Sequence, residues 1–297
     1  MAGAYQQRRL SQIRTNMTNT TREWSTQDYV DFAKLLIPPW YFNKVFENTN
    51  ISDGQLIEIR GYRTAIAVGP ALLDLSADQA TFLRYPAAGV AYVLQSSDAD
   101  DDVGDTGAEY VKIDFLNAAG IADSVVVAMN GVGQVAALAA DQARAINGMK
   151  VIQAGATRTN EGVITLTNAA VTAELCRIPV GTGRSHACRY HVPVGKNLLV
   201  SRFLMECGAS VGDGQGFDLV GTIYDPDTLA PSAPGCLRDL GPWALLEGQK
   251  WEHIFEEVQI IPASTATVIS EVAAWVTGDV AGTDDAAASI FGLLVDV

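Results

Sequence analysis

The segment Val125-Val-Val-Ala-Met-Asn-Gly-Val-Gly-Gln-Val135 decides the fold class of this chain. It places Asn130-Gly131 between two apolar runs. An Asn-Gly pair in that position is the strongest short signal for a β-hairpin, because both residues accept the positive φ angles of a type I′ turn. We therefore predict one antiparallel strand on each side of the pair, and antiparallel β-structure in the sequence around them.

Strand-like segments continue in both directions from this pair. Alternation of apolar and polar residues, punctuated by Gly and Pro, predicts strands with one solvated face per sheet. The predicted strands are 56–60, 89–94, 109–115, 125–129, 132–135 and 162–167, and beyond residue 179 they are 187–192, 197–205, 217–224, 251–261, 267–276 and 290–297. The stretch Ala136–Ala145 is alanine-rich and compatible with a helix.

The spacing of these segments is typical of β-sandwiches and jelly rolls. We predict a mainly β protein with two antiparallel domains behind an N-terminal arm that carries one short helix. The arm with an aromatic anchor segment covers residues 1–50, the first β-sandwich domain covers residues 51–178, and the second, jelly-roll-like domain covers residues 179–297.

The predicted arm differs from the rest of the chain in charge and in aromatic content. Residues 1–22 hold four arginines and no acid, so the net charge of −14 less these four leaves −18 on the remainder. Ser25 and Asp28 resemble a capping box, and apolar residues at helical spacing follow as far as Pro38-Pro39. Seven aromatic residues lie between Trp24 and Phe46. They either pack under the following domain or contact another chain.

We expect the arm to bind a partner through its cationic and aromatic side chains. The candidate docking residues are Arg8, Arg9, Arg14, Trp24, Trp40, Tyr41 and Phe42.

Composition narrows the classes of function. A chain of 297 residues with 48% hydrophobic content can build large cores. A net charge of −14 disfavours nucleic acid and anionic membranes as partners. The sequence has neither an apolar run of about 20 residues nor the apolar core of a signal peptide, so we expect a soluble protein made in a cytoplasm. Four cysteines without a Cys-x-x-Cys pair indicate buried thiols rather than a disulfide scaffold.

One segment matches a hydrolase motif. Gly208-Ala-Ser210-Val-Gly212 fits the Gly-x-Ser-x-Gly pattern of a nucleophilic serine. The motif needs a strand before it and a helix after it, whereas the sequence that follows predicts another strand. We therefore favour a glycine-rich loop over an esterase. The acids and the histidine in the required chain order are Asp218, Asp225, Asp239 and His253.

Two clusters could suggest a metal ion. The acidic run Asp98–Asp105 has carboxylates at EF-hand spacing, but Val103 occupies the position where the loop needs glycine. His186 and Cys188 would share one face of a strand, while His191 would point to the other. We predict a solvated acidic loop, with a Ca²⁺ loop of a type other than the EF-hand as the alternative. We predict no zinc site, no cofactor and no enzymatic activity.

A resemblance to a known class rests on an ordered series of short motifs. They are Tyr92-Val-Leu-Gln-Ser-Ser97, the acidic loop, Asp105-Thr-Gly-Ala-Glu-Tyr-Val-Lys-Ile-Asp-Phe-Leu116, Val126-Val-Ala-Met-Asn-Gly-Val132, Glu161-Gly-Val-Ile-Thr-Leu166 and Tyr190-His-Val-Pro-Val-Gly-Lys196. Over residues 90–205 this order resembles virion structural proteins of tailed bacteriophages. The resemblance implies a β-rich, oligomeric, non-enzymatic particle component.

These observations lead to one functional prediction and two alternatives. We predict a bacteriophage virion structural protein, a capsid decoration or fibre protein, assembled in the bacterial cytoplasm as a homotrimer that docks on other virion proteins. The first alternative is a tail or baseplate adaptor. The second is a carbohydrate-binding module that recognises a host surface through Trp243, Trp251 or Trp275.

Overall fold

The computed structural model describes residues 55–66, 85–207, 215–224, 236–245, 249–265, 268–278 and 284–296. Nearly all of them belong to one compact unit, residues 53–255 and 259–297. These described residues form strands and turns with no helix, in several antiparallel sheets, which confirms the prediction of a mainly β protein. The predicted arm, with its helix after Ser25, lies outside the described residues.

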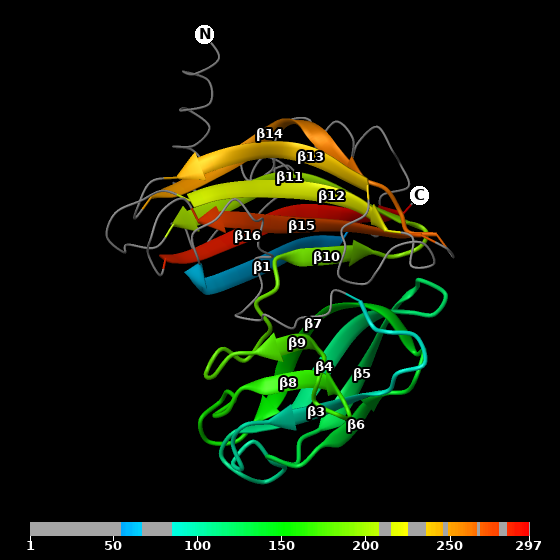
Figure 1. Cartoon of the computed structure of the whole chain (residues 1–297), viewed down its shortest axis with the longest axis vertical. Helices are drawn as coiled ribbons and strands as arrows, with labels where there is room; N and C mark the ends of the chain where they lie inside the picture. The colour runs from blue at the N-terminus through cyan, green and yellow to red at the C-terminus, as the bar shows by residue number, and fades with distance from the viewer. Residues whose placement is uncertain are drawn as a thin grey trace, which may run out of the picture. The chain divides into compact units, whose positions relative to one another are not determined.

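Two four-stranded sheets make up what we call the main sheet pair. One sheet has the order β1-β16-β11-β14 and the other β10-β15-β12-β13, and every pairing is antiparallel (Figure 1). The strands are β1 (Gln55–Ile66), β10 (Arg189–Val192), β11 (Lys196–Cys207), β12 (Gln215–Tyr224), β13 (Cys236–Leu245), β14 (Lys250–Ile261), β15 (Ile269–Gly278) and β16 (Asp284–Asp296).

The inner faces of these two sheets pack on each other because apolar residues alternate along their strands. Ile59, Phe203 and Ile290 come from one sheet, and Val192 and Val272 from the other, and all five belong to a single buried cluster. Burial of such side chains is worth about 1.5–3 kcal/mol each, which is the main source of stability for a β-sandwich.

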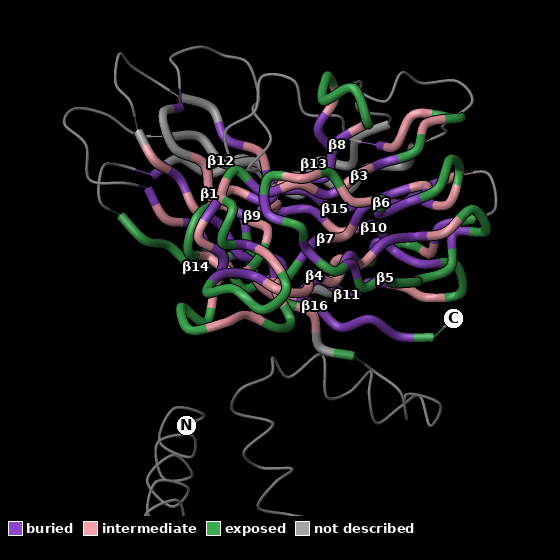
Figure 2. Tube along the Cα trace, turned by 90° about the horizontal axis from the view of Figure 1, so that it is seen from below, coloured by how far each residue is buried: buried purple, intermediate pink, exposed green. Residues whose placement is uncertain are grey.

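The described residues between β1 and β10, which begin at Tyr85, form a second set of strands, the inserted sheet pair. One sheet has the order β6-β3-β8-β9 and the other β5-β4-β7. The strands are β3 (Tyr92–Ser96), β4 (Ala108–Asn117), β5 (Ala122–Ala128), β6 (Val135–Leu138), β7 (Ala143–Ala154), β8 (Ile164–Asn168) and β9 (Glu174–Ile178). Leu94 and Leu166 of the first sheet share a buried cluster with Val111, Phe115 and Ile146 of the second. Figure 2 shows burial concentrated along the strands and exposure at the turns.

The hairpin predicted at Asn130-Gly131 is wrong. A turn does occur there, closed by a hydrogen bond from the Gly133 N–H to the Asn130 carbonyl (2.8 Å), but β5 and β6 on its two sides join different sheets. Gly131 has φ +54°, and a Cβ on it would lie 2.6 Å from the Ala99 carbonyl oxygen. The glycine is therefore needed for a close approach between two loops as well as for the turn.

The segment Ala136–Ala145 contains no helix. It holds β6, a turn with Asp141 at φ 58°, and the start of β7. Alanine has low β-propensity, and here burial of Ala137, Ala143 and Ala145 between sheets overrides it.

The pairing of β1 was not foreseen in the sequence. β1 pairs with β16, from Gln55 opposite Leu294 to Ile66 opposite Asp284. It therefore belongs to the main sheet pair, whereas the sequence pattern assigns it to the first predicted domain, residues 51–178. The limits of the two domains stay a prediction.

Candidate functional sites

The predicted docking site lies entirely outside the described residues. Residues 1–50, with all seven candidate docking residues from Arg8 to Phe42, lie outside the described residues. The same holds for Gly208–Gly212 with Ser210, and for Asp225. Asp218 and Asp239 lie on β12 and β13 as backbone positions. His253, on β14, packs its ring edge against Phe255 at 4.7 Å between centroids.

The residues weighed as zinc ligands point in different directions. The Cys188 thiol lies in the main core, 3.6 Å from the Ala288 carbonyl oxygen. The ring of His186 meets Tyr62 edge-on at 6.5 Å, and burial followed by the cations Arg184 and Arg60 lowers the pKa of that histidine. Among the described residues, no group of three or more His, Cys, Asp or Glu side chains converges on a metal position. Cys176, Cys188 and Cys207 are buried thiols, as predicted.

His191 takes part in a buried hydrogen-bonded joint between the two sheet pairs. Asn147 on β7 accepts the His191 backbone N–H on its Oδ1 (2.8 Å) and donates from its Nδ2 to the His191 carbonyl (3.1 Å). His191 Nδ1 lies 2.9 Å from the same Oδ1, so this ring nitrogen must carry a proton. His191 Nε2 lies 2.9 Å from Glu271 Oε2, and the Tyr85 hydroxyl donates to the same oxygen (2.9 Å).

This joint is closed to solvent. The side chains of His191 and Glu271 are 0% exposed. Arg189, two residues before His191 on β10, is 2% exposed and donates to the Leu175 carbonyl on β9 (3.1 Å). Tyr85, Leu116, Ala145 and Ile269 add a small apolar cluster. The arrangement fixes β7 and β9 against β10 and β15, and its ionisable groups are too enclosed to reach a substrate.

The acidic loop is organised around one buried carboxylate. Asp101 is 0% exposed, and its Oδ1 accepts the backbone N–H groups of Ala108 and Glu161, both at 2.8 Å. Its Oδ2 accepts the Ser96 hydroxyl at 2.5 Å and the Gly162 N–H at 2.9 Å. The central acid of the run therefore ties the loop to the 160–163 turn.

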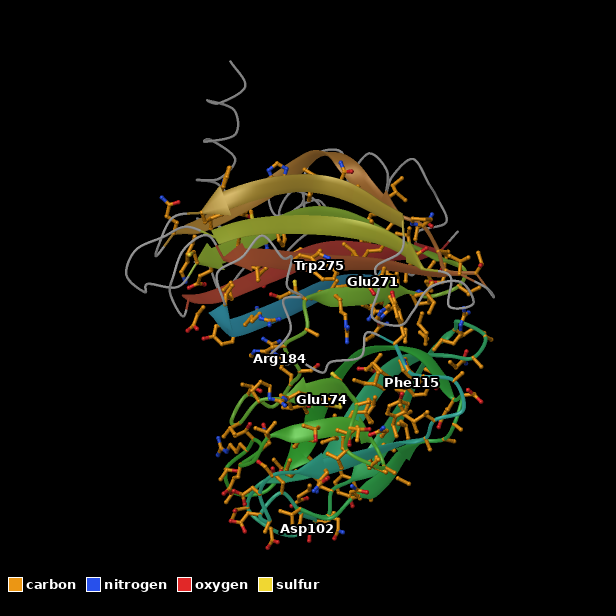
Figure 3. All side chains as sticks on the ribbon, viewed as in Figure 1. Asp102, Phe115, Glu174, Arg184, Glu271 and Trp275 are labelled. Carbon is orange, nitrogen blue, oxygen red and sulfur yellow. The ribbon has the colours of Figure 1, made fainter. Side chains whose placement is uncertain are left out.

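The other acids of this loop repel one another. Asp100 is exposed, and the negative charge of Glu161, followed by smaller contributions that include Asp98 and Asp105, raises the pKa of its carboxyl. Asp102 lies at the tip of the inserted sheet pair, far from Arg184 (Figure 3).

A polar groove of about 650 Å³ lies where β1 approaches the sheet β5-β4-β7. Its lining includes Arg60, Lys112, Asp114, Lys150, Arg184 and Tyr190. Burial, and then the negative charge of Asp114, raises the pKa of Tyr190 to about 12. Asp114 itself pairs with Lys112 at 2.5 Å.

Among the tryptophans weighed for sugar binding, Trp251 on β14 is 49% exposed. Trp275 on β15 is half-buried, and Trp243 lies on β13, where only the backbone is described. No helix of the described residues is long and apolar enough to cross a membrane.

No protein-family model matches the sequence, and no curated protein is significantly similar to it. Three solved structures with weak similarity come from infectious bursal disease virus. The Gx strain structure is 11% identical, covers 88% of this chain and 78% of that chain, and has a TM-score of 0.27. The VP2 subviral particle is 9% identical, covers 84% and 74%, and has a TM-score of 0.25. The T13 viral particle is 11% identical, covers 83% and 71%, and has a TM-score of 0.23. At these TM-scores the likeness carries no argument about this chain.

Proposed function

We propose that this chain is a non-enzymatic structural protein of a virus particle, and that the eight strands of the main sheet pair form a jelly roll. The observation that carries the proposal is their strand order. Jelly rolls consist of eight strands in two Greek keys, and they are used by viral capsid proteins, lectins and cupins.

The pairing within the main sheet pair supports a jelly roll strand by strand. Along the chain, the first of its eight strands pairs with the last, β1 with β16. The second pairs with the seventh, β10 with β15, and the third with the sixth, β11 with β14. The two middle strands, β12 and β13, pair with each other. In a jelly roll, four such antiparallel pairs form one long ribbon that folds into two facing sheets. Folding of this ribbon gives the strand orders β1-β16-β11-β14 and β10-β15-β12-β13.

The interior of the roll favours a structural role over an enzymatic one. A cupin-like enzyme would need polar ligands inside its roll, whereas residues such as Val200, Phe203, Met205 and Ile290 fill this interior and are 0% exposed. The polar groove lies outside it, between β1 and the inserted sheet pair.

Exposed apolar residues on β14 support assembly. β14 ends its sheet, and Trp251, Ile254 and Ile260 on it are 49%, 53% and 38% exposed. An edge strand with such side chains is a candidate interface. A partner chain could pair with its free backbone N–H and C=O groups and bury its exposed apolar surface.

The finer assignment rests on the motif order over residues 90–205. It favours a tailed-bacteriophage capsid decoration or fibre protein that docks by residues 1–50 and associates as a homotrimer, with a tail or baseplate adaptor as the alternative. The experiment is to measure the copy number of this chain relative to the major shell protein in purified particles, by quantitative mass spectrometry. A ratio near one supports capsid decoration, a much lower ratio supports a tail component, and absence from the particle overturns the proposal.

Docking by the arm has its own test. Particles stripped of this protein are incubated with the full chain, or with variants in which Arg8, Arg9 and Arg14 become Glu, or Trp40 and Tyr41 become Ala. We expect both variants to lose rebinding, because cationic and aromatic groups contribute most at interfaces. A Val180→Ala variant, at an exposed position outside both the arm and β14, serves as the control, and full rebinding of both arm variants would place the docking surface elsewhere.

A carbohydrate-binding module is the second candidate, and the exposure of Trp251 is the observation that favours it. Exposed aromatic rings are natural platforms for sugars. Trp251→Ala should then abolish glycan binding on an array without lowering the melting temperature, while Ile254→Ala on the same strand should not. Binding by neither the native chain nor the control would remove this candidate.

A further inference from the structure

Three cations stand in a row on the outer face of the inserted sheet pair. Lys112 on β4 is the register partner of Lys150 on β7, and Lys150 is in turn bridged to Arg184 in the segment that leads to β10. The bridge is held on both sides, by hydrogen bonds from Val151 N–H to the Gly183 carbonyl and from Ser185 N–H to the Met149 carbonyl, each at 2.8 Å. We call Lys112, Lys150 and Arg184 the basic row.

The basic row is electrostatically unfavourable in the isolated chain. Like charges directly opposite one another on neighbouring strands destabilise a sheet. Lys112 has Asp114 as an ion-pair partner, but Lys150 and Arg184 are exposed and form no ion pair with a described residue. The groove also holds acidic residues, of which Glu58 pairs with Arg60 and Asp114 pairs with Lys112, so its uncompensated positive charge lies at Lys150 and Arg184. An anionic group bound between Lys150 and Arg184 would offset this repulsion.

The same chain carries the complementary surface. The acidic loop presents Asp98, Asp100 and Asp105 beside Glu161, and the pKa of Asp100 is raised because these carboxylates repel one another. The loop is preorganised, since the buried Asp101 accepts four hydrogen bonds from three segments: the end of β3, the start of β4 and the turn at residues 161–162. Arg184 and Asp102 lie at opposite ends of the inserted sheet pair, so one copy cannot satisfy both surfaces with itself (Figure 3).

We propose that the basic row in the groove receives the acidic loop of a second copy of this chain, in a head-to-tail contact. This deepens the proposed function and rests on it, because it supplies a contact for assembly. The positive charge of the basic row and the negative charge of the acidic loop compensate each other. In a pair of copies joined in this way, one copy still has a free basic row and the other copy still has a free acidic loop. Such a heterologous contact closes into a ring or continues as an open filament.

The experiment is charge reversal in the full-length chain, with association measured by sedimentation velocity and native mass spectrometry. One variant reverses the row (K150E/R184E), and another reverses the loop (D100K/D105K), leaving Asp101 in place. We expect each variant alone to associate at least about tenfold more weakly than the native chain. An equimolar mixture should recover association, because the intact row of the second variant meets the intact loop of the first. Raising the ionic strength should weaken the native contact.

The control has the same change in charge at a different place. K196E/K250E reverses two lysines of the main sheet pair, each in a surface ion pair. It should associate like the native chain, and an equal loss in the control would attribute the effect to net charge and overturn the inference. Circular dichroism and melting curves confirm that each variant folds.

The outcomes separate this inference from the proposed function. If the row and loop variants assemble as the native chain does, the head-to-tail contact is wrong while assembly as a particle protein stands. If the chain is absent from particles, the proposed function fails whatever the variants do. A polygalacturonate oligosaccharide is the probe for the competing ligand. Binding that is lost in K150E/R184E but kept in D100K/D105K, with no association of the native chain, would assign the row to acidic sugars and overturn the inference.

Discussion

His191 Nε2 lies 2.9 Å from Glu271 Oε2, and both side chains are shielded from solvent. Asn147 keeps the proton on the other ring nitrogen, because its amide is oriented by the backbone of His191 itself. The remaining ring nitrogen, Nε2, therefore faces the carboxyl group of Glu271. This contact connects adjacent strands of the main sheet pair at the point where β7 of the inserted sheet pair is attached.

Replacing Glu271 by alanine should destabilise the protein strongly. The change leaves the His191 ring and the Tyr85 hydroxyl without their shared acceptor in a buried site, and removal of one partner of a buried pair costs about 3–5 kcal/mol. Urea unfolding at neutral pH measures the loss. Glu252→Ala is the matched control, since it breaks the exposed pair with Arg202 (2.9 Å) and should cost less than about 1 kcal/mol. Equal effects in the two variants would contradict the role of the joint.

Asp101→Asn should loosen the acidic loop while keeping its shape. The amide cannot accept all four hydrogen bonds, so a buried donor loses its partner at a cost of about 1–3 kcal/mol. Hydrogen exchange read by NMR should show faster exchange at the amides of Ala108, Glu161 and Gly162. Asp105→Asn, at an exposed position of the same loop, should leave these rates unchanged. Unchanged exchange in the Asp101 variant would show that other contacts hold the loop.

Gly155→Ala should disrupt the same region for a steric reason. A Cβ on Gly155 would lie in direct collision with the Asp105 carbonyl oxygen and 2.9 Å from the Thr106 Cα. Backbone atoms on both sides must shift, and we expect a loss of about 1–3 kcal/mol, typical of overpacking. Gly195→Ala, whose Cβ would meet open space at φ +77°, should show only the strain of the left-handed backbone, about 1–2 kcal/mol. Thermal unfolding measures the loss of stability in both variants. Hydrogen exchange at the Gly107 amide distinguishes them, because only Gly155→Ala should change its exchange rate.

We expect the free energy of unfolding to decrease at alkaline pH because of Tyr190. Its pKa is raised from 10.0 to about 12, so the folded state favours the neutral phenol. A raised pKa contributes stability that is fully present below pH 10 and is lost as pH rises through about 12. Tyr190→Phe should therefore flatten this fall by on the order of 2 kcal/mol. Unfolding curves for both proteins between these pH values test it, and parallel curves would contradict it.

Several elements of the fold were predictable because local patterns coincide with tertiary burial. The alternation at Glu109–Phe115 became β4, and that at Trp251–Ile261 became most of β14. β7, β9 and β13 were missed. In β7 and β13, alanine, glycine and proline conceal the alternation, and β9 is a short strand, Glu174–Ile178, buried at four of its five positions.

The pairing partners required the tertiary structure. β1 joins β16 across more than two hundred residues, and nothing in the local pattern of either strand names the other. Asn130-Gly131 has the chemistry of a hairpin, yet the strands beside it join different sheets, because β5 pairs with β4 and β6 pairs with β3.

Residue types and their periodicity, which the sequence contains by itself, determined that the described part of this chain is mainly β and that Cys176, Cys188 and Cys207 are buried thiols. The tertiary structure alone decided which charges meet. Lys150 and Arg184 are 34 residues apart in the chain and become neighbours through a single bridge. Two of the four donors to Asp101, Glu161 and Gly162, lie 60 and 61 residues away from it. Electrostatic and hydrogen-bonding energies depend on distances of a few ångströms, and such distances arise only when remote strands are brought into register.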